Sequence, residues 1–207
     1  FMIHSSAKLF TGYLQVQDEE YWENRSLDES IVLEKEKLHQ LKQIEHLSSF
    51  TPRLESYSLV SFDKNTRVSQ IIGIAPESEN EMTAVKMRLT QGRYLQNSDD
   101  GVLLGEGLAR LLEISLGDSV VIYGQGYQGQ PAIALLPVVG VVKLPFKQMN
   151  NGMVFLSLSK AQDVFLAYNR ITSLPIMVDN IKHMENVKSE PEQVFPDDVI
   201  KTWDEMM

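Results

Sequence analysis

Cysteine is absent from this chain of 207 residues. Its absence excludes a disulfide framework, a thiol nucleophile and a cysteine-based zinc site. Long hydrophobic runs are missing too, because the most apolar stretch, residues 132–142, is too short to span a bilayer and contains Pro137 and Gly140. Positive charge is scarce, with 19 Lys and Arg against 28 Asp and Glu and a net charge of −9. This balance argues against nucleic acid as a partner.

The remaining composition is that of a globular protein. Hydrophobic residues make up 43% and charged residues 23% of the chain, which is sufficient for one large domain or two small ones. The first residues lack the basic start and long apolar middle of a signal peptide. Since the chain opens at Phe1 and closes at Met207 without a turn or tail, we expect it to be a piece of a longer protein.

The first part of the chain alternates between strand and helix patterns. Residues 12–17 have the two-residue period of a half-buried strand, and the polar stretch 18–24 is typical of a loop. A capping-box spacing at 26–29 predicts the start of a helix over 31–47, which Pro52 ends. The next predicted elements are a strand at 53–62, a turn at 63–66, a strand at 67–74 and a short helical segment at 76–87.

From Leu89 to Leu144 the sequence has the short apolar runs, glycines and tight turns of a β-rich region. This pattern predicts one brief helix at 106–112, a polar hairpin tip at 124–130, and strands at 102–105, 119–123 and 136–142. The α/β texture then resumes, with strands at 153–158, 173–178 and 199–203 and helices at 161–168 and 181–188. The predicted fold class is α+β (mixed α/β), with a β-rich module inserted into an α/β one.

Patterns that carry chemistry are weak in this sequence. His39 and His46 are seven residues apart, too far for one metal ion on a helix, so we expect them on a solvated face. Gly105 and Gly107 open a helix, but Arg110 stands where a dinucleotide site needs its third glycine. The adjacent carboxylates at 99–100 and 197–198 do not converge, and no Gly-x-Ser-x-Gly occurs. The sequence therefore predicts no catalytic, cofactor or metal site, and no enzyme.

A set of motifs runs in order along the chain. It comprises Thr11–Gln17 (TGYLQVQ), Gly73–Glu77 followed by Gln91–Leu95, and then Val102–Ala109 (VLLGEGLA), Leu116–Val120 (LGDSV) and Val138–Val142 (VVGVV). Together these stretches resemble the large extracytoplasmic domain of FtsX-superfamily ABC-transporter permeases, of the macrolide-exporter (MacB) or lipoprotein-releasing (LolC/LolE) type. The later helix with Gln162 and the final Lys201-Thr202-Trp203 match the same family.

The resemblance implies a domain in two parts: a discontinuous porter-like α/β domain at 1–88 plus 146–207, and an inserted β-rich sabre-like subdomain at 89–145. Membrane helices would flank the chain, which would lie on the periplasmic side of the cell inner membrane with residues 1–10 and 200–207 close together. The expected partners are a second permease subunit or copy, a cytoplasmic ATPase that binds the ATP, and a periplasmic protein or lipoprotein.

Two functions remain open under the resemblance. The first is a non-catalytic domain that couples cytoplasmic ATP hydrolysis to the movement of cargo or a partner. The cargo would be a lipoprotein, a peptide or a small amphiphile. The second is an FtsX-like regulatory domain that activates a cell-envelope hydrolase and transports nothing.

The matched motif residues are expected to serve the scaffold. They are Gly12, Gly73, Pro76, Gly92, Gly105, Glu106, Leu108, Ala109, Gly117, Asp118 and Gly140. Partner contact is instead expected at Tyr127 and Gln128, in an exposed hairpin tip. That tip is short and uncharged, which disfavours the hook by which a lipoprotein-releasing subunit docks a periplasmic chaperone.

Overall fold

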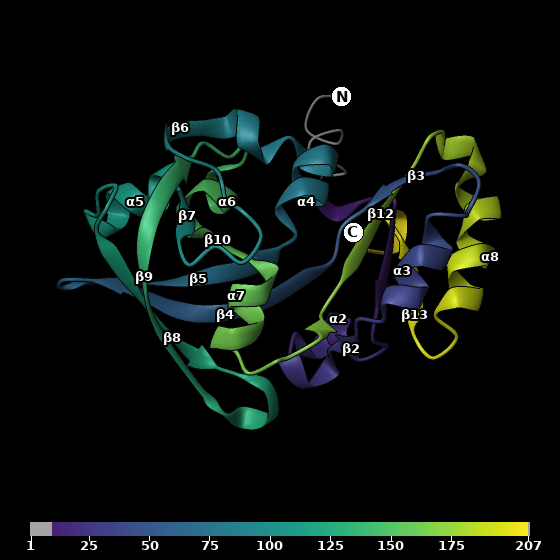
Figure 1. Ribbon diagram of the computed structural model, residues 1–207, viewed down its shortest axis with the longest axis horizontal. Helices are drawn as coiled ribbons and strands as arrows, with labels where there is room; N and C mark the ends of the chain where they lie inside the picture. Colours follow the sequence, from purple (N-terminus) through teal and green to yellow (C-terminus); the bar gives the residue numbers. More distant parts are fainter. Residues whose placement is uncertain (1–9, 207) are drawn as a thin grey trace.

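The computed structural model describes residues 10–206, which form two main β-sheets with helices packed on them and a third sheet of only two short strands (Figure 1). The smaller sheet has four antiparallel strands in the order β13-β1-β12-β3. Their bounds are β1 (Leu14–Gln17), β3 (Leu47–Phe50), β12 (Leu174–Val178) and β13 (Val199–Thr202). Helices α3 (Lys35–Leu41) and α8 (Met184–Val194) pack beside it and bury Leu41 and Val187 in a shared core.

The larger sheet has seven strands in the order β6-β9-β7-β10-β5-β4-β8. Strand β8 also pairs with β9, so the sheet curls round and closes on itself. The strands are β4 (Arg53–Phe62), β5 (Asn65–Ile74), β6 (Leu89–Gly92), β7 (Val102–Gly105), β8 (Ser119–Gln125), β9 (Pro131–Val142) and β10 (Met153–Ser157). The mixed α+β class is confirmed.

Two cores lie on the two faces of the larger sheet. Alternation along β4 buries Leu54 and Val60 in the inner core and turns Tyr57 and Leu59 outward. Helices α5 (Glu106–Leu112) and α7 (Leu158–Val164) close the inner core. On the outer face, a second core around Phe155 lies near α4 (Pro76–Thr83) and α6 (Lys147–Gly152) and covers only part of the sheet.

The helix predicted over 31–47 is wrong at both ends. Residues Ile31–Val32 form strand β2, which pairs with β11 (Arg170–Ile171), and residues 47–50 form β3. Both strands pair with segments more than a hundred residues away, and this pairing outweighs the local helical pattern. The Ser26 hydroxyl does cap a helix start, but of a single 3-10 turn, Leu27–Glu29, whose Asp28 amide donates to it.

Other predicted bounds also shift. The loop predicted at 18–24 contains helix α2 (Tyr21–Asn24), and the helix predicted at 181–188 runs instead from Met184 to Val194 with Pro191 inside it. The predicted boundaries at 88/89 and 145/146 do not separate the two sheets, because β4, β5 and β10 share one sheet with β6 to β9. The sequence pattern indicates how long the strands are and how often turns occur. It does not indicate which strands pair, because pairing depends on the tertiary fold.

The described ends of the chain run side by side. Leu14 at the start of β1 pairs with Thr202 at the end of β13, and the Trp203 amide donates to the Tyr13 carbonyl at 2.9 Å. The expectation for residues 1–10 falls mostly on residues 1–9, which lie outside the described residues. Within residues 10–206, no helix combines the length and the apolar character that crossing a membrane requires.

A substitution at Gly73 tests the packing of α7 on β5. A methyl group added at Gly73 would collide with the Ala161 side chain, which is rigid and lies in α7. We expect Gly73→Ala to lower the free energy of unfolding by about 1–3 kcal/mol, the usual cost of overpacking. Urea unfolding measures the loss. Gly152→Ala is the matched control because a methyl group there meets open space, and equal stability of the two variants would contradict this account.

Candidate functional site

The motif residues lie in turns, at helix starts and in the core, and they do not converge on one cleft. Gly105 ends β7 directly before α5, and its Cα faces the backbone of Asn150 so closely that a side chain has no room. Asp118 accepts a hydrogen bond from the Ser115 amide at 2.9 Å, which closes the turn before β8. Leu108 and Ala109 are buried in the inner core.

The remaining motif residues have similar places. Gly92 has φ +74° at the end of β6 and pairs with Gly140 of β9, where the two backbones approach closely. The others are Gly12, buried before β1, Gly73 in β5, Pro76 at the first turn of α4, Glu106 at the start of α5, and Gly117 in the turn before β8.

The hairpin tip between β8 and β9 folds back on the chain. The Tyr127 amide donates to the Phe165 carbonyl at 2.8 Å, and the Arg170 guanidinium lies 4.4 Å from the centre of the Tyr127 ring. The Gln128 amide donates to the Asp28 carboxylate at 2.6 Å. Tyr127 is therefore half-buried rather than at an exposed tip, and its contacts are made within the chain. An exposed apolar surface lies on another part of the molecule.

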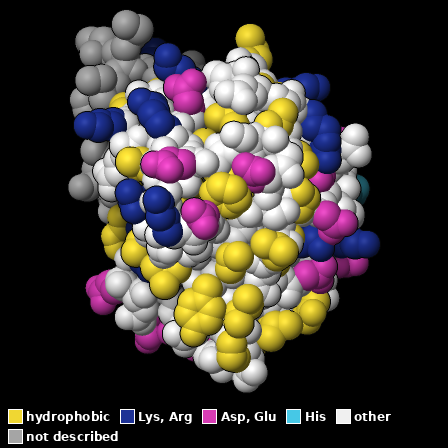
Figure 2. All heavy atoms as spheres, turned by 90° about the vertical axis from the view of Figure 1, so that its left-hand side faces the viewer, with side chains coloured by type: hydrophobic (Ala, Val, Ile, Leu, Met, Phe, Trp, Pro, Cys, Tyr) yellow, Lys and Arg dark blue, Asp and Glu magenta, His cyan; other side chains and the backbone are white. Residues whose placement is uncertain are grey.

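That surface is the uncovered outer face of β4, β5, β8 and β9. Outward positions of these strands carry large apolar side chains where a solvated sheet carries polar ones. Val68, Ile133 and Leu135 are 69%, 66% and 67% exposed. We call the set the apolar face: Tyr57, Leu59, Val68, Val121, Tyr123, Ile133 and Leu135. Figure 2 looks onto the side of the molecule where β8 and β9 lie, and hydrophobic side chains gather in its lower half.

Strand register makes the apolar face continuous. Leu59 pairs with Val68 on one side and with Tyr123 on the other, and Tyr123 pairs in turn with Ile133. These four side chains form one row across four strands, because directly paired residues point to the same side of a sheet. A contiguous exposed apolar patch of this kind is typical of a binding surface.

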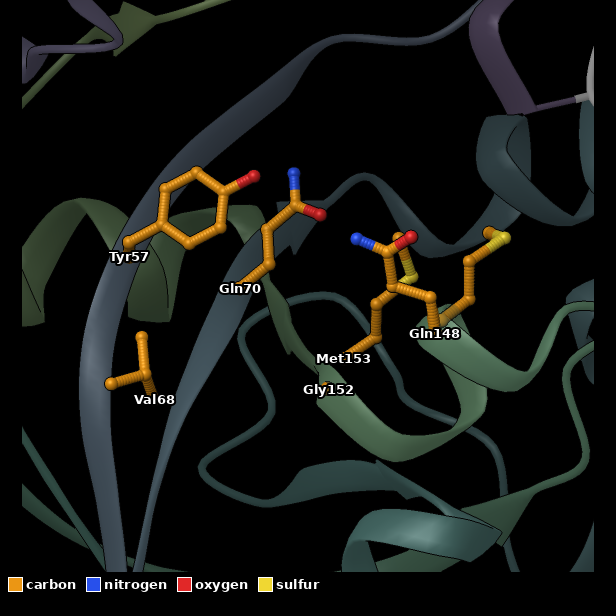
Figure 3. Close-up of a pocket in the computed structure, with 7 residues that line it drawn as sticks. Tyr57, Val68, Gln70, Gln148, Gly152 and Met153 are labelled. Atoms are coloured by element: carbon orange, nitrogen blue, oxygen red, sulfur yellow. The ribbon is translucent and has the colours of Figure 1, made fainter.

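The apolar face continues into a groove beside α6 (Figure 3). Figure 3 shows Tyr57 and Gln70 on adjacent strands at one side of the groove, and Gln148, Gly152 and Met153 at the other. Val68 and Met149 complete the lining, and the volume is about 310 Å³. Methionine side chains adapt to irregular apolar partners. Apart from the Tyr57 phenol the lining has no titratable group, so the groove is suited to binding and offers no acid–base pair.

A second hollow extends from this groove toward the smaller sheet. It shares Tyr57, Gln70, Met149 and Met153 with the groove, and Arg53 and Glu79 also line it. The Arg53 Nε and Nη2 atoms each donate to a Glu79 carboxylate oxygen at 2.8 Å. Burial acts to lower the pKa of the Arg53 guanidinium, but the attraction of Glu79 outweighs it and the pKa is raised. This buried ion pair serves as a fixed support of the hollow.

The sequence contained a signal for the apolar face. The strands at 119–123 and 131–137 are apolar at both parities, which is the pattern of a strand buried on both sides. The structure covers only one of those sides. Sequence reasoning began this strand at Leu136 and assigned Ile133 and Leu135 to no element, so it missed the surface that they form.

Comparison with known proteins shows which proteins share this fold. The family model described as MacB-like periplasmic core domain matches residues 2–194. The periplasmic region of MacB from Actinobacillus actinomycetemcomitans superposes with a TM-score of 0.62 at 17% identity, over 92% of this chain and 88% of that one. The extracellular domain of the noncanonical ABC-type transporter YknZ, from Gram-positive bacteria, gives 0.63 at 13% identity, over 89% and 91%.

Curated relatives point the same way. The chain is 26% identical over 148 residues to the lipoprotein-releasing system transmembrane protein LolE of Haemophilus influenzae, and 22% identical over 147 residues to LolC of Xylella fastidiosa. These alignments cover 68% and 67% of this chain but 35% of each relative, so the chain spans about a third of their length. The family match covers nearly the whole chain, and the protein belongs to the family of MacB-like periplasmic core domains.

Proposed function

We propose that this chain is the extracytoplasmic domain of an ABC-transporter permease, that it is non-catalytic, and that it passes movement driven by cytoplasmic ATP hydrolysis to a cargo or partner outside the membrane. The single observation that carries the proposal, beside the family, is the apolar face with its adjoining groove. An extended apolar surface is suited to pressing against another protein or an amphiphilic cargo.

The scaffold supports this role. The strands that carry the apolar face belong to a closed sheet, so hydrogen bonds on both edges of β4, β5, β8 and β9 hold the surface together as one unit. A rigid surface that takes two positions transmits a population shift from one site to another. No cofactor is part of the proposal for this domain, and the ATP is assigned to a separate nucleotide-binding subunit or domain.

Site-specific photocrosslinking in the intact permease tests the proposal. We expect a photoreactive amino acid at Ile133 to capture a protein partner, a second permease copy or the cargo, in a yield that changes when ATP is supplied or hydrolysis is blocked. Position 87 is the matched control, because Met87 is similarly exposed but lies off the apolar face. Equal yields at both positions, or no response to nucleotide, would contradict the proposal.

The captured species also separates the two functions. Lipoprotein or a small amphiphile in the crosslinked product supports transport. A cell-envelope hydrolase in that product would assign the domain to the regulatory class, in which the same face holds an enzyme in its active state. The replacement of Tyr123, Ile133 and Leu135 by Gln together is expected to abolish either activity and to leave the circular dichroism spectrum unchanged, because all three side chains are exposed.

A further inference from the structure

Three potential metal ligands meet on the smaller sheet, far from the apolar face. His46 lies in the turn before β3, Asp179 directly follows β12, and His183 ends the 3-10 turn before α8. The Asp179 carboxylate oxygens lie 2.8 Å from His46 Nδ1 and 3.0 Å from His183 Nδ1. All three donor atoms are within 4.8 Å of one another. Sequence reasoning paired His46 with His39 and did not consider its true neighbours.

The backbone holds these residues together. The antiparallel strands β3 and β12 pair as far as Leu47 and Val178, so the turn before β3 and the turn after β12 lie side by side. The Asp179 amide donates to the His46 carbonyl at 2.9 Å, and His46 takes the left-handed conformation with φ +67°. The Asn180 side chain then caps the turn that presents His183, by accepting from the Lys182 amide. The main-chain hydrogen bond therefore positions the side chains of His46 and Asp179.

The donor set has the chemistry of a transition-metal site. Two imidazole nitrogens and one carboxylate oxygen are the ligands that Zn²⁺ takes in open sites with three protein ligands. Tetrahedral ligands of Zn²⁺ lie roughly 3.3 Å apart when the bonds are about 2.05 Å. Each imidazole contacts a different oxygen of Asp179, at 2.8 and 3.0 Å, and the three donor atoms lie within 4.8 Å of one another, so small side-chain rotations would bring them to this spacing. All three side chains are partly exposed, so an ion can enter and water can occupy the fourth position.

Electrostatics at the cluster favour a cation. The Asp179 carboxylate lies within hydrogen-bond distance of both Nδ1 atoms, so it can balance part of the charge of a cation held by the two imidazoles. The two imidazole rings lie with their centres 3.8 Å apart, so both can face one ion. Glu45, whose carboxylate lies 3.9 Å from His46 Nε2, adds further negative charge.

We propose that His46, Asp179 and His183 form a binding site for a divalent transition metal ion of the Zn²⁺ class. An ion there would join the turn after α3 to the turn before α8. It would thus fasten together the two helices that pack beside the smaller sheet. The open fourth position would accept water or a donor group from another protein.

Metal titration of the 207-residue chain tests the proposal. The chain is first treated with a chelator, which is then removed. Calorimetric titration with Zn²⁺ is expected to show one ion bound per chain. In thermal unfolding, added Zn²⁺ is expected to raise the melting temperature. Titration with Co²⁺ is expected to give the visible absorption of a four- or five-coordinate ion. His46→Gln, His183→Gln and Asp179→Asn should each weaken Zn²⁺ binding by more than about tenfold, since even an outer partner of a ligand is worth that much.

His39→Gln is the matched control, because His39 is an exposed histidine of α3 outside the cluster. It is expected to bind Zn²⁺ as the unaltered chain does. Each variant is first melted in chelator, so that a loss of fold is told apart from a loss of ligand, and three separate ligand variants guard against one that misfolds. Zn²⁺ binding that all three variants retain, or that His39→Gln reduces equally, would overturn the proposal.

Discussion

Replacement of Arg53 by Ala is expected to lower the free energy of unfolding by about 3–5 kcal/mol, because it leaves the Glu79 carboxylate buried without its partner. The Arg53 and Glu79 side chains are 7% and 1% exposed. Both guanidinium-to-carboxylate contacts are parallel hydrogen bonds, the geometry in which such a pair is strongest. Arg53 also donates to the Phe10 carbonyl, so the same substitution releases the segment that leads into β1.

The chain offers a sharp control for this effect. Lys37 and Glu34 form an exposed pair at 3.1 Å, and Lys37→Ala is expected to change stability by less than about 1 kcal/mol. The double variant Arg53→Met with Glu79→Met should recover much of the loss, because no charge is then left buried. Urea unfolding of the four proteins measures all three differences. A single Arg53 variant as stable as the double variant would show that the buried carboxylate is not the source of the loss.

Asp99→Ala is expected to cost up to about 2 kcal/mol at pH 7 and to remove part of the acid sensitivity of the fold. The hydrogen bonds from Arg93 are the largest cause that lowers the pKa of the Asp99 carboxyl from 3.8 to about 2, and the Gly101 and Gln96 amides add to it. The Asp99 carboxylate is 5% exposed, whereas Arg93 is 53% exposed. Solvent weakens the contribution of Arg93, so about 2 kcal/mol is the upper bound of the loss, and the two amides supply the part that solvent does not weaken.

The sign of the pH effect follows from the direction of the shift. The folded state binds the proton of Asp99 more weakly than the unfolded chain does, so the stabilisation is present above about pH 4 and is lost as the pH falls toward 2. Free energies of unfolding measured between pH 2 and 6 should fall more steeply for the unaltered chain than for Asp99→Ala. The neighbour Asp100, which is 77% exposed, is the control position. Parallel pH curves for the unaltered chain and Asp99→Ala would contradict the assignment.

Local elements were predictable from the sequence wherever neighbours decide them. The hairpin at 53–62 and 67–74 and the brief helix at 106–112 are present, because turn residues and a leucine-rich turn of helix act over a few positions. Ile31 and Val32 could not be placed in this way, since their strand exists only by pairing with Arg170 and Ile171.

The candidate sites were less predictable than the fold. Ile133 and Leu135 differ from core residues only in what covers them, and coverage is a property of the whole fold. The sequence indicates part of the cluster at His46, because Asp179 and His183 have the i, i+4 spacing that brings side chains together. That spacing does not disclose the partner, because His46 joins them from 133 residues away.

The position of β1 sets an order on folding. This strand lies between β12 and β13, so the hydrogen bonds on both of its edges come from the last part of the chain. All strands of the larger sheet lie between residues 53 and 157, so during synthesis that sheet can assemble before β1 has a partner. The chain between β1 and β12 is a long loop, and closing a long loop is slow. Strand β1 should therefore become resistant to protease later than the strands of the larger sheet as the chain emerges from the ribosome.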